Sequence, residues 1–273
     1  MKRPPAPSRT ARARPAAGAF TLLELLAVIV IIAVLATLLL PAFRSAKLHS
    51  YAIRSSQNLR QLVAANIAYA TDQGSYAPAD NKSNNRRWHG GRTGAGGRFD
   101  PARGFLADYF GKSGAVLACP LFTEMLHGAQ SFEDGTGGYG YNSAYIGGRP
   151  GGAWNADGTR LSARPAQVPR PSVTLMFATS AFARADGVQE YASVEPPFWD
   201  YGSGPSGDRP SPSLHFRFQG KAIVGWCDGH ISMEAKGPRP AGTNPYGGDA
   251  DAHDLGWFGP DEANGYWNPD REP

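Results

Sequence analysis

The sequence contains little cysteine, methionine or charge: its 273 residues include 2 cysteines and 4 methionines, and 18% are Asp, Glu, Lys or Arg. Long apolar runs are equally scarce, because residues 20–43 form the only stretch long enough to cross a bilayer. This excludes a multi-pass transporter. The 34 glycines and 23 prolines favour turns over continuous helix, so a coiled coil and a helical bundle are excluded as well.

Acidic residues are absent from residues 1–19, whereas five basic residues lie there. This leader accounts for the formal net charge of +4, since the rest of the chain holds 22 basic and 23 acidic residues. A nucleic-acid-binding protein needs a basic face on its folded part, so we expect no nucleic-acid partner. One further group of arginines is interpreted as a solvated loop: Arg86, Arg87, Arg92 and Arg98.

Residues 20–43 read FTLLELLAVIVIIAVLATLLLPAF, and their only polar side chains are Thr21, Glu24 and Thr37. A helix of this length spans the apolar core of a bilayer. The basic leader would hold the N-terminus on the cytoplasmic side. A plain single-pass anchor is the simplest interpretation, but it does not explain Glu24, because an ionised carboxylate within a membrane costs about 3 kcal/mol.

Glu24 needs a partner, and residues 15–43 contain no Lys, Arg or His. The run Gly-Ala-Phe-Thr-Leu-Leu-Glu-Leu-Leu, which begins at Gly18, resembles the signal of type IV prepilins. The resemblance implies that prepilin peptidase cuts after Ala19 and methylates Phe20, so that Glu24 becomes the fifth mature residue. A cut after Gly18 is the alternative, but it would make Glu24 the sixth. In that family the acid pairs with the N-terminal amine of a neighbouring subunit as the filament forms.

The apolar helix is expected to continue as an amphipathic extension, because apolar residues recur with a broken helical period beyond it. Gly74 and Pro78 predict its end, and Pro41 predicts a kink or the exit from the membrane. Pilin-like proteins pack such an extension on an antiparallel sheet. The resemblance therefore implies an α+β pilin-like fold with a leader at 1–19, a transmembrane helix at 20–43, an amphipathic extension at 44–74 and a β-rich head at 75–273.

Two short β-rich runs in the head predict strands, at residues 173–178 and 221–227. Asp228 and Gly229 separate the second run from another strand-like run, HISMEA. Asp-Gly between two such runs predicts a tight hairpin in which both turn residues have positive φ. We therefore interpret Asp228, Gly229 and His230 as a hairpin rather than as a catalytic group.

A second resemblance is carried by several short segments of the chain: Asn58-Leu59-Arg60-Gln61-Leu62, Gly74-Ser75-Tyr76, Cys119-Pro120, Tyr139-Gly140-Tyr141-Asn142 and Trp226-Cys227-Asp228-Gly229-His230. They are similar to prepilin-like proteins of planctomycetes and verrucomicrobia that are named for a His-x9-Asp-Gly signature. Here Phe218 stands at the histidine position, and the nearest upstream histidine, His215, precedes Asp228 by 12 intervening residues. This resemblance implies an architecture and an export route, but no activity.

Cys119 and Cys227 would lie outside the cytoplasmic membrane, where oxidation is favoured. A disulfide between them would stabilise the head by about 4 to 5 kcal/mol in the chain-entropy model. Two buried free thiols are an equal alternative, because pairing geometry cannot be read from a sequence.

Two groups of residues are candidate metal ligands. Asp249, Asp251 and Asp254 form an acidic run that suits calcium, although it lacks the glycine and the final glutamate of an EF-hand loop. A solvated surface loop is the favoured interpretation of this run. His215, Asp228 and His230 could hold zinc if the hairpin brought them together, but tetrahedral sites show closer ligand spacing.

Ten aromatic residues lie in Gly-rich, Pro-rich or polar surroundings: Tyr139, Tyr141, Tyr145, Trp154, Trp199, Tyr201, Trp257, Phe258, Tyr266 and Trp267. If they are buried, they fill a loop-rich core that has few aliphatic runs. If they are exposed, they form platforms that bind glycans or proteins. Burial is the favoured interpretation.

We expect a structural subunit of a type IV pilus or a type II secretion pseudopilus, without catalysis and without a cofactor. Its expected partners are prepilin peptidase, other pilin or pseudopilin subunits and the inner membrane. The N-terminus would be cytoplasmic and the head periplasmic, or at the cell surface after assembly. One alternative is a membrane-anchored surface protein whose head binds polysaccharide or an envelope partner. Another is a membrane-tethered hydrolase that uses His215, Asp228 and His230.

Overall fold

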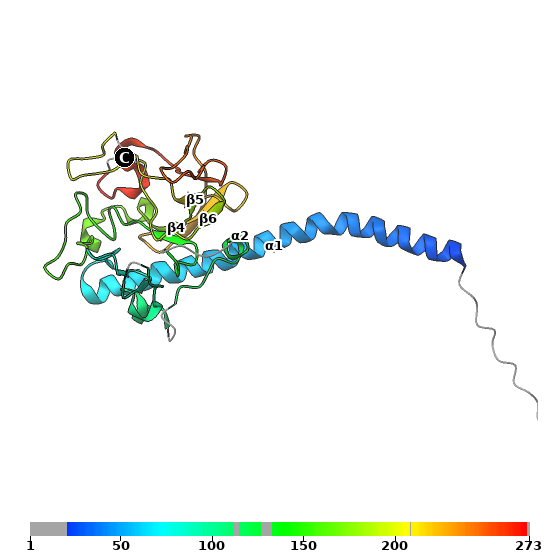
Figure 1. Ribbon diagram of the computed structural model, residues 1–273, viewed down its shortest axis with the longest axis horizontal. Coiled ribbons are helices and arrows are strands. Elements are labelled where there is room, and N and C mark those ends of the chain that lie inside the picture. Colours follow the sequence, from blue (N-terminus) through cyan, green and yellow to red (C-terminus); the bar gives the residue numbers. More distant parts are fainter. Residues whose placement is uncertain (1–20, 95, 112–114, 127–132, 208, 272–273) are drawn as a thin grey trace, which may run out of the picture. The chain divides into compact units, whose positions relative to one another are not determined.

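The structure, a computed structural model, describes residues 21–94, 96–111, 115–126, 133–207 and 209–271. The chain divides into two compact units after Lys47. One helix, α1 (Leu22–Gln73), contributes its first part to the N-terminal unit and its second part to the head (Figure 1). The predicted α+β class is confirmed, because a long apolar helix is followed by a head of antiparallel sheets.

The segment of α1 at residues 22–43 is apolar on all sides apart from Glu24 and Thr37. Its large apolar side chains are exposed, and α1 is the one helix of the described residues that is long and apolar enough to cross a membrane. Thr37 donates from Oγ1 to the Val34 carbonyl (2.7 Å), so this hydroxyl is satisfied within the helix. The helix continues through Pro41, which lies inside it rather than at its end.

The second part of α1 buries one face in the head. Its buried residues recur at the three- and four-residue spacing of a helix face: Ser55, Leu59, Leu62, Val63, Ala65, Asn66 and Ala70. The predicted end of the helix is confirmed, because α1 stops at Gln73. Gly74 follows in the left-handed region (φ +76°) and donates its N–H to the Ala70 carbonyl (2.9 Å).

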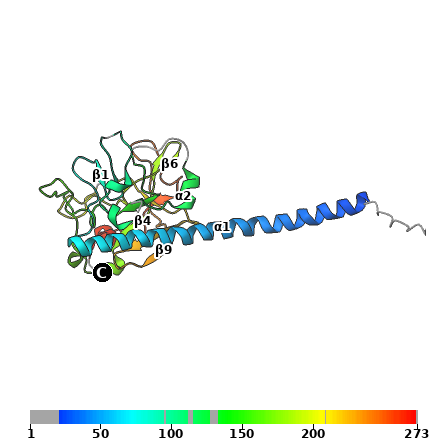
Figure 2. The same ribbon diagram turned by 90° about the horizontal axis from the view of Figure 1, so that it is seen from below.

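The main sheet of the head has four antiparallel strands in the order β3-β4-β8-β9. They are β3 (Tyr139–Tyr141), β4 (Leu175–Thr179), β8 (Lys221–Trp226) and β9 (Ile231–Ala235). Both predicted runs therefore contain strands, β4 and β8, and these two occupy the centre of the sheet. Figure 2 shows the second part of α1 running beside β4 and β9.

The central strands send side chains to both faces of the sheet. Ile223 of β8 packs in the same apolar cluster as Leu59 and Val63 of α1. Its neighbours Ala222 and Val224 belong to a second cluster that also contains three C-terminal aromatic residues, Trp257, Phe258 and Trp267. This alternation follows from the two-residue period of a strand. The sheet is therefore covered by α1 on one face and by the C-terminal segment on the other.

Short elements complete the head. Three small antiparallel pairs are formed by β1 (Arg86–Arg87) with β2 (Gly90–Gly91), β5 (Phe182–Arg184) with β6 (Gly187–Gln189), and β7 (Leu214–His215) with β10 (Leu255–Gly256). The head also contains a short helix, α2 (Pro120–Met125). Its described 3-10 segments are Pro101–Arg103, Ala107–Tyr109, Pro165–Gln167, Pro171–Val173 and Glu262–Trp267. Loops make up much of the rest, as the glycine and proline content predicts.

The predicted hairpin joins β8 to β9, but its turn differs from the expected one. Trp226 donates its N–H to the His230 carbonyl (3.0 Å), so the loop has three residues, Cys227 to Gly229. Of these three residues, Gly229 has a positive φ (+97°) and Asp228 does not. The prediction that both turn residues have positive φ is therefore wrong, because a three-residue loop needs a left-handed residue only at its last position.

Candidate functional site

Thr21 and Glu24 form a reciprocal cap at the start of α1. The Thr21 N–H and hydroxyl both donate to Glu24 Oε2 (2.9 Å each), and the Glu24 N–H donates to Thr21 Oγ1 (3.2 Å). This is the capping-box arrangement, in which two otherwise unpaired donors of a helix N-terminus are satisfied together. Sequence reasoning sought the partner of Glu24 in a new N-terminal amine, on this chain or on a neighbouring copy. It missed the bonds from Thr21, although the Thr-x-x-Glu pattern of residues 21–24 is their signal.

Glu24 keeps one oxygen for another partner. Oε2 accepts both bonds from Thr21, and Oε1 accepts none from the described residues. The predicted processing residues Gly18, Ala19 and Phe20 lie outside the described residues. Thr21 therefore orients the Glu24 carboxylate through Oε2, and Oε1 can accept a hydrogen bond from a further donor.

Asp228 and His230 form a local pair in the β8–β9 hairpin. Asp228 Oδ1 accepts the His230 N–H (3.1 Å) and lies 2.6 Å from Nδ1 of the same histidine. The His230 ring stacks on Trp226, with ring centroids 5.4 Å apart and planes 11° apart. These contacts stiffen the turn, which supports the hairpin interpretation of Asp228, Gly229 and His230.

His215 lies elsewhere, fully buried in β7. Burial lowers its pKa well below the usual value, and the nearby charges of Arg217 and His253 lower it further, so the imidazole is neutral. Among the described residues no group of three or more His, Cys, Asp or Glu side chains could hold a metal ion. His215, Asp228 and His230 are therefore not gathered into a zinc site or a catalytic group.

Cys119 and Cys227 are both buried and both free. The disulfide that the sequence allowed is absent, and the alternative of two buried thiols describes the structure. Cys119 Sγ accepts a hydrogen bond from the Ser55 hydroxyl of α1 (3.1 Å). Burial raises the pKa of Cys227, and the neighbouring Asp228 charge raises it further, so this thiol stays protonated and unreactive.

The aspartates of the acidic run, residues 249–254, form hydrogen bonds that hold the local loops in place. Asp251 accepts N–H bonds from Ala241 and Gly242 (2.9 Å each, to Oδ2) and the Lys236 ammonium (3.0 Å, to Oδ1). These contacts lower the pKa of Asp251. Asp249 caps the N–H of Ala252 (3.1 Å). Asp254 lies in the left-handed region, with φ +53°. The carboxylates of Asp249 and Asp251 thus accept bonds from backbone and lysine donors, and the three aspartates form no shared ligand cage among the described residues.

The arginines at residues 86–98 require a correction. Arg87 and Arg92 are buried rather than solvated. Arg87 NH2 pairs with Glu133 Oε1 (2.6 Å), and Arg98 pairs with Asp134 (2.7 Å). The solvated-loop interpretation was therefore wrong for Arg87 and Arg92, whereas Arg86 and Arg98 are exposed as it expected. It failed at Arg87 because the acidic partner comes from 46 residues away in the sequence.

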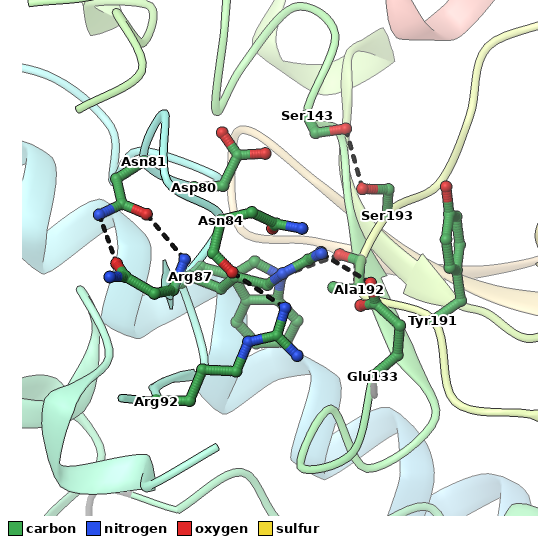
Figure 3. Close-up of polar contacts among 12 residues, drawn as sticks. Asp80, Asn81, Asn84, Arg87, Arg92, Glu133, Ser143, Tyr191, Ala192 and Ser193 are labelled. Atoms are coloured by element: carbon green, nitrogen blue, oxygen red, sulfur yellow. Dashed lines mark hydrogen bonds and ion pairs between the residues drawn. The ribbon is translucent and has the colours of Figure 1, made fainter. Parts of the chain in front are cut away.

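The Arg87–Glu133 pair lies at a polar cavity of about 360 Å³. Figure 3 shows the pair between Asn84 and Tyr191. Burial raises the pKa of Glu133, while the charges of Arg87 and Arg92 oppose that rise. We call this space the Trp cavity, because its lining includes two tryptophans: Asp80, Asn81, Lys82, Asn84, Arg87, Glu133, Ser143, Ala144, Trp154, Arg160, Tyr191, Ser193, Glu195 and Trp199.

Most of the aromatic residues singled out in the sequence are core residues, as expected. Tyr139, Tyr141, Tyr145, Trp257, Phe258 and Trp267 are buried. Three others reach solvent: Trp154 is 38% exposed, Trp199 37% and Tyr201 64%. Trp154 and Trp199 line the same cavity, so two of these three exposed aromatic residues lie together.

Comparison with known proteins places one motif on this chain. Residues 14–40 match the model of the prokaryotic N-terminal methylation motif. The match includes Thr21 and Glu24 and is consistent with a type IV prepilin-like protein. The motif implies processing by prepilin peptidase, pilin subunits as partners and anchoring in a membrane, and it points to a structural subunit rather than to an enzyme. No curated protein and no solved structure matches the chain.

Proposed function

We propose that the protein is a structural subunit, a pilin or pseudopilin, that assembles into a type IV pilus or a type II secretion pseudopilus without catalysing a reaction itself. The observation that carries this proposal is the methylation motif at residues 14–40, joined to a helix that continues from it into the head. In this proposal residues 1–19 are the leader, 20–43 the transmembrane and assembly helix, 44–74 its extension and 75–273 the head.

The proposed processing begins on the cytoplasmic side of the inner membrane. Prepilin peptidase removes the leader after Ala19 and methylates Phe20, and the head lies in the periplasm before assembly. Glu24 then has a second role besides its cap on α1. Its Oε1 is available to accept a bond from the N-terminal amine of a neighbouring subunit, which would neutralise two charges that are costly in lipid.

The geometry of the head supports a role in assembly rather than catalysis. His215, Asp228 and His230, the residues of the hydrolase alternative, are divided between a buried strand and a hairpin. Cys119 and Cys227 are buried, and the pKa of Cys227 is raised, which does not suit a nucleophile.

The mass of the N-terminal peptide tests the proposal. The full chain is isolated from cells with and without prepilin peptidase, and we expect a mature N-terminus at methylated Phe20 only when the peptidase is present. Ala19→Leu places a bulky side chain before the cut and should leave Met1 intact. Gly18→Ala keeps a small residue there and is the matched control. An intact N-terminus in the presence of the peptidase, or a cut beyond residue 43, would overturn the proposal.

A further inference from the structure

A second cavity adjoins the Trp cavity on the head. It has a volume of about 710 Å³, and it shares four lining residues with the Trp cavity: Asn84, Arg87, Glu133 and Tyr191. Its other walls include Phe182 and Tyr246, and Tyr246 is 80% exposed. We call this space the Tyr246 cavity. The shared side chains, the Arg87–Glu133 pair among them, form a boundary between the two cavities, and we call the two adjoining cavities together the groove.

The boundary between the two cavities holds buried polar atoms that lack partners. Glu133 is 2% exposed, and its Oε2 has no hydrogen-bond partner among the described residues. Arg87 is 8% exposed, and its Nε is likewise without a partner. Buried donors and acceptors are almost always satisfied, since leaving one unpaired costs about 1 to 3 kcal/mol. A ligand that both donates and accepts hydrogen bonds would satisfy this acceptor and this donor together.

A second buried carboxylate lies nearby. Glu195 is 6% exposed, and its Oε1 accepts a bond from the Tyr191 hydroxyl (2.8 Å). Burial raises the pKa of Glu195, and the hydrogen bond from Tyr191 opposes that rise. Ser143 and Ser193, whose hydroxyls are 3.0 Å apart, add further donors and acceptors to the same wall (Figure 3).

The lining of the groove is balanced in charge. It contains four acidic and four basic residues: Asp80, Glu133, Asp186, Glu195, Lys82, Arg87, Arg160 and Arg184. Six of these form ion pairs within the lining, Arg160 with Asp80 (2.7 Å), Arg87 with Glu133 (2.6 Å) and Arg184 with Asp186 (3.7 Å). A phosphate or a nucleic acid needs an uncompensated basic surface, so this lining does not suit a polyanion.

Exposed aromatic rings line both cavities of the groove. Trp154 and Trp199 edge the Trp cavity, and Tyr246 edges the other. Trp154 is held in place, because the Arg160 guanidinium lies 5.0 Å from its ring centre and is itself fixed by two bonds to Asp80. An exposed, fixed aromatic ring offers a flat apolar surface at little entropic cost.

We propose that this groove binds a neutral, hydroxyl-rich chain, that is, an oligosaccharide. A sugar ring has an apolar C–H face that can lie on Trp154 or Trp199, and it has vicinal hydroxyls that both donate and accept. Those hydroxyls would bind the unpartnered atoms of Glu133 and Arg87. Two adjoining cavities, each lined by an exposed aromatic ring, fit several linked sugar rings rather than a single one. This inference does not depend on filament assembly.

Binding is tested with the full chain in a polyoxyethylene detergent, which has no sugar headgroup to compete. The probes are cellohexaose, maltohexaose, xylohexaose and mannohexaose, with oligogalacturonate and a sulfated oligosaccharide as charged comparisons. We expect at least one neutral probe to bind, and Trp199→Ala to raise its Kd about tenfold or more. Trp199→Phe should bind better than Trp199→Ala. Tyr201→Ala is the matched control, because Tyr201 is exposed but lines neither cavity.

Chemical oxidation of tryptophan in the wild-type chain gives a second test of binding, and this test does not require any variant to fold. N-bromosuccinimide should oxidise Trp154 and Trp199 in the free protein, and a saturating neutral probe should protect both. The four buried tryptophans report that the fold is intact: Trp88, Trp226, Trp257 and Trp267. The inference is overturned if no neutral probe binds, if only the charged probes bind, or if binding leaves Trp154 and Trp199 unprotected. The N-terminal mass would be unaffected by any of these results.

Discussion

Asn66 of α1 and Tyr141 of β3 are joined by a buried hydrogen bond of 2.9 Å, from the Asn66 amide to the Tyr141 hydroxyl. Both side chains are fully buried. Asn66 Oδ1 also accepts the Ala77 N–H (2.8 Å), and Tyr141 donates to the Ala77 carbonyl (3.0 Å). Burial raises the pKa of Tyr141 well above its usual value, so the phenol remains a donor. Helix, sheet and the segment after the helix are thus connected at one point.

Replacing Asn66 with leucine should destabilise the head by about 2 kcal/mol, because the Ala77 N–H would be left buried without a partner. For a unit of this size that corresponds to a fall in Tm of about 4 to 8 °C. Gln57→Leu, on the exposed side of the same helix, is the control and should change Tm little. Thermal unfolding followed by near-UV circular dichroism measures both. Equal effects of the two substitutions would contradict a special role for Asn66.

Gly225 of β8 should not tolerate alanine. A Cβ there would lie 2.6 Å from Val63 Cγ2, so α1 and the sheet would have to separate. We expect a loss of about 1 to 3 kcal/mol, the usual cost of overpacking a core. Gly207→Ala is matched to it, because nothing lies within 4 Å of the added carbon and the backbone there is not left-handed. Urea unfolding of the two variants should separate them, and similar midpoints would show that the contact at Val63 is unimportant.

The elements that the sequence predicted are those decided by local rules. The end of α1 follows from Gly74, and the hairpin at Asp228 and Gly229 follows from turn chemistry. The Arg87–Glu133 pair was not predictable, because its partners lie 46 residues apart and nothing local sets their distance. The same limit applies to the groove, whose walls come from distant loops. The cap between Thr21 and Glu24 was readable from the sequence but was overlooked.

Stability should fall as the pH is lowered from 7.5 to 5.5, because His89 and His215 are buried and neutral. Burial lowers the pKa of each well below its usual value. In the unfolded chain an imidazole titrates near pH 6.5, so below that pH the unfolded state binds protons that the folded state does not. Each histidine should therefore remove about 1 kcal/mol of stability over this range.

Buried carboxylates act in the opposite direction, so the effect is best measured as a difference. Burial raises the pKa values of Glu133, Glu190 and Glu195, and protonation of these groups favours the folded state as the pH falls. The experiment is urea unfolding of the wild type and His215→Leu at pH 7.5 and 5.5. The variant should lose about 1 kcal/mol less than the wild type over that range. An unchanged pH dependence would show that His215 binds a proton as readily in the folded state as in the unfolded state.

The two cysteines should be protected by burial and not by a disulfide. Without reductant, iodoacetamide should modify neither Cys119 nor Cys227 in the native protein and both after unfolding in urea. Intact mass measures the number of added groups. If labelling of the unfolded chain required a reductant, the two residues would be paired in the natural protein. Ser55→Ala serves as a local probe, because it removes the hydroxyl that donates to Cys119 and should speed labelling of that residue first.

Glu24→Ala should still be cut by prepilin peptidase but should not be incorporated into filaments, because the cut lies before the helix whereas the carboxylate acts between subunits.

Thr21→Val removes the hydroxyl that holds Glu24 Oε2 while keeping the shape of the side chain. Losing this cap costs about 1 kcal/mol, so incorporation should fall about fivefold. Thr21→Ser retains the hydroxyl and should behave as the wild type. The measurements are the N-terminal peptide mass in membranes and the amount of chain in sheared filaments. Wild-type incorporation of Glu24→Ala would show that the carboxylate serves only to cap its own helix.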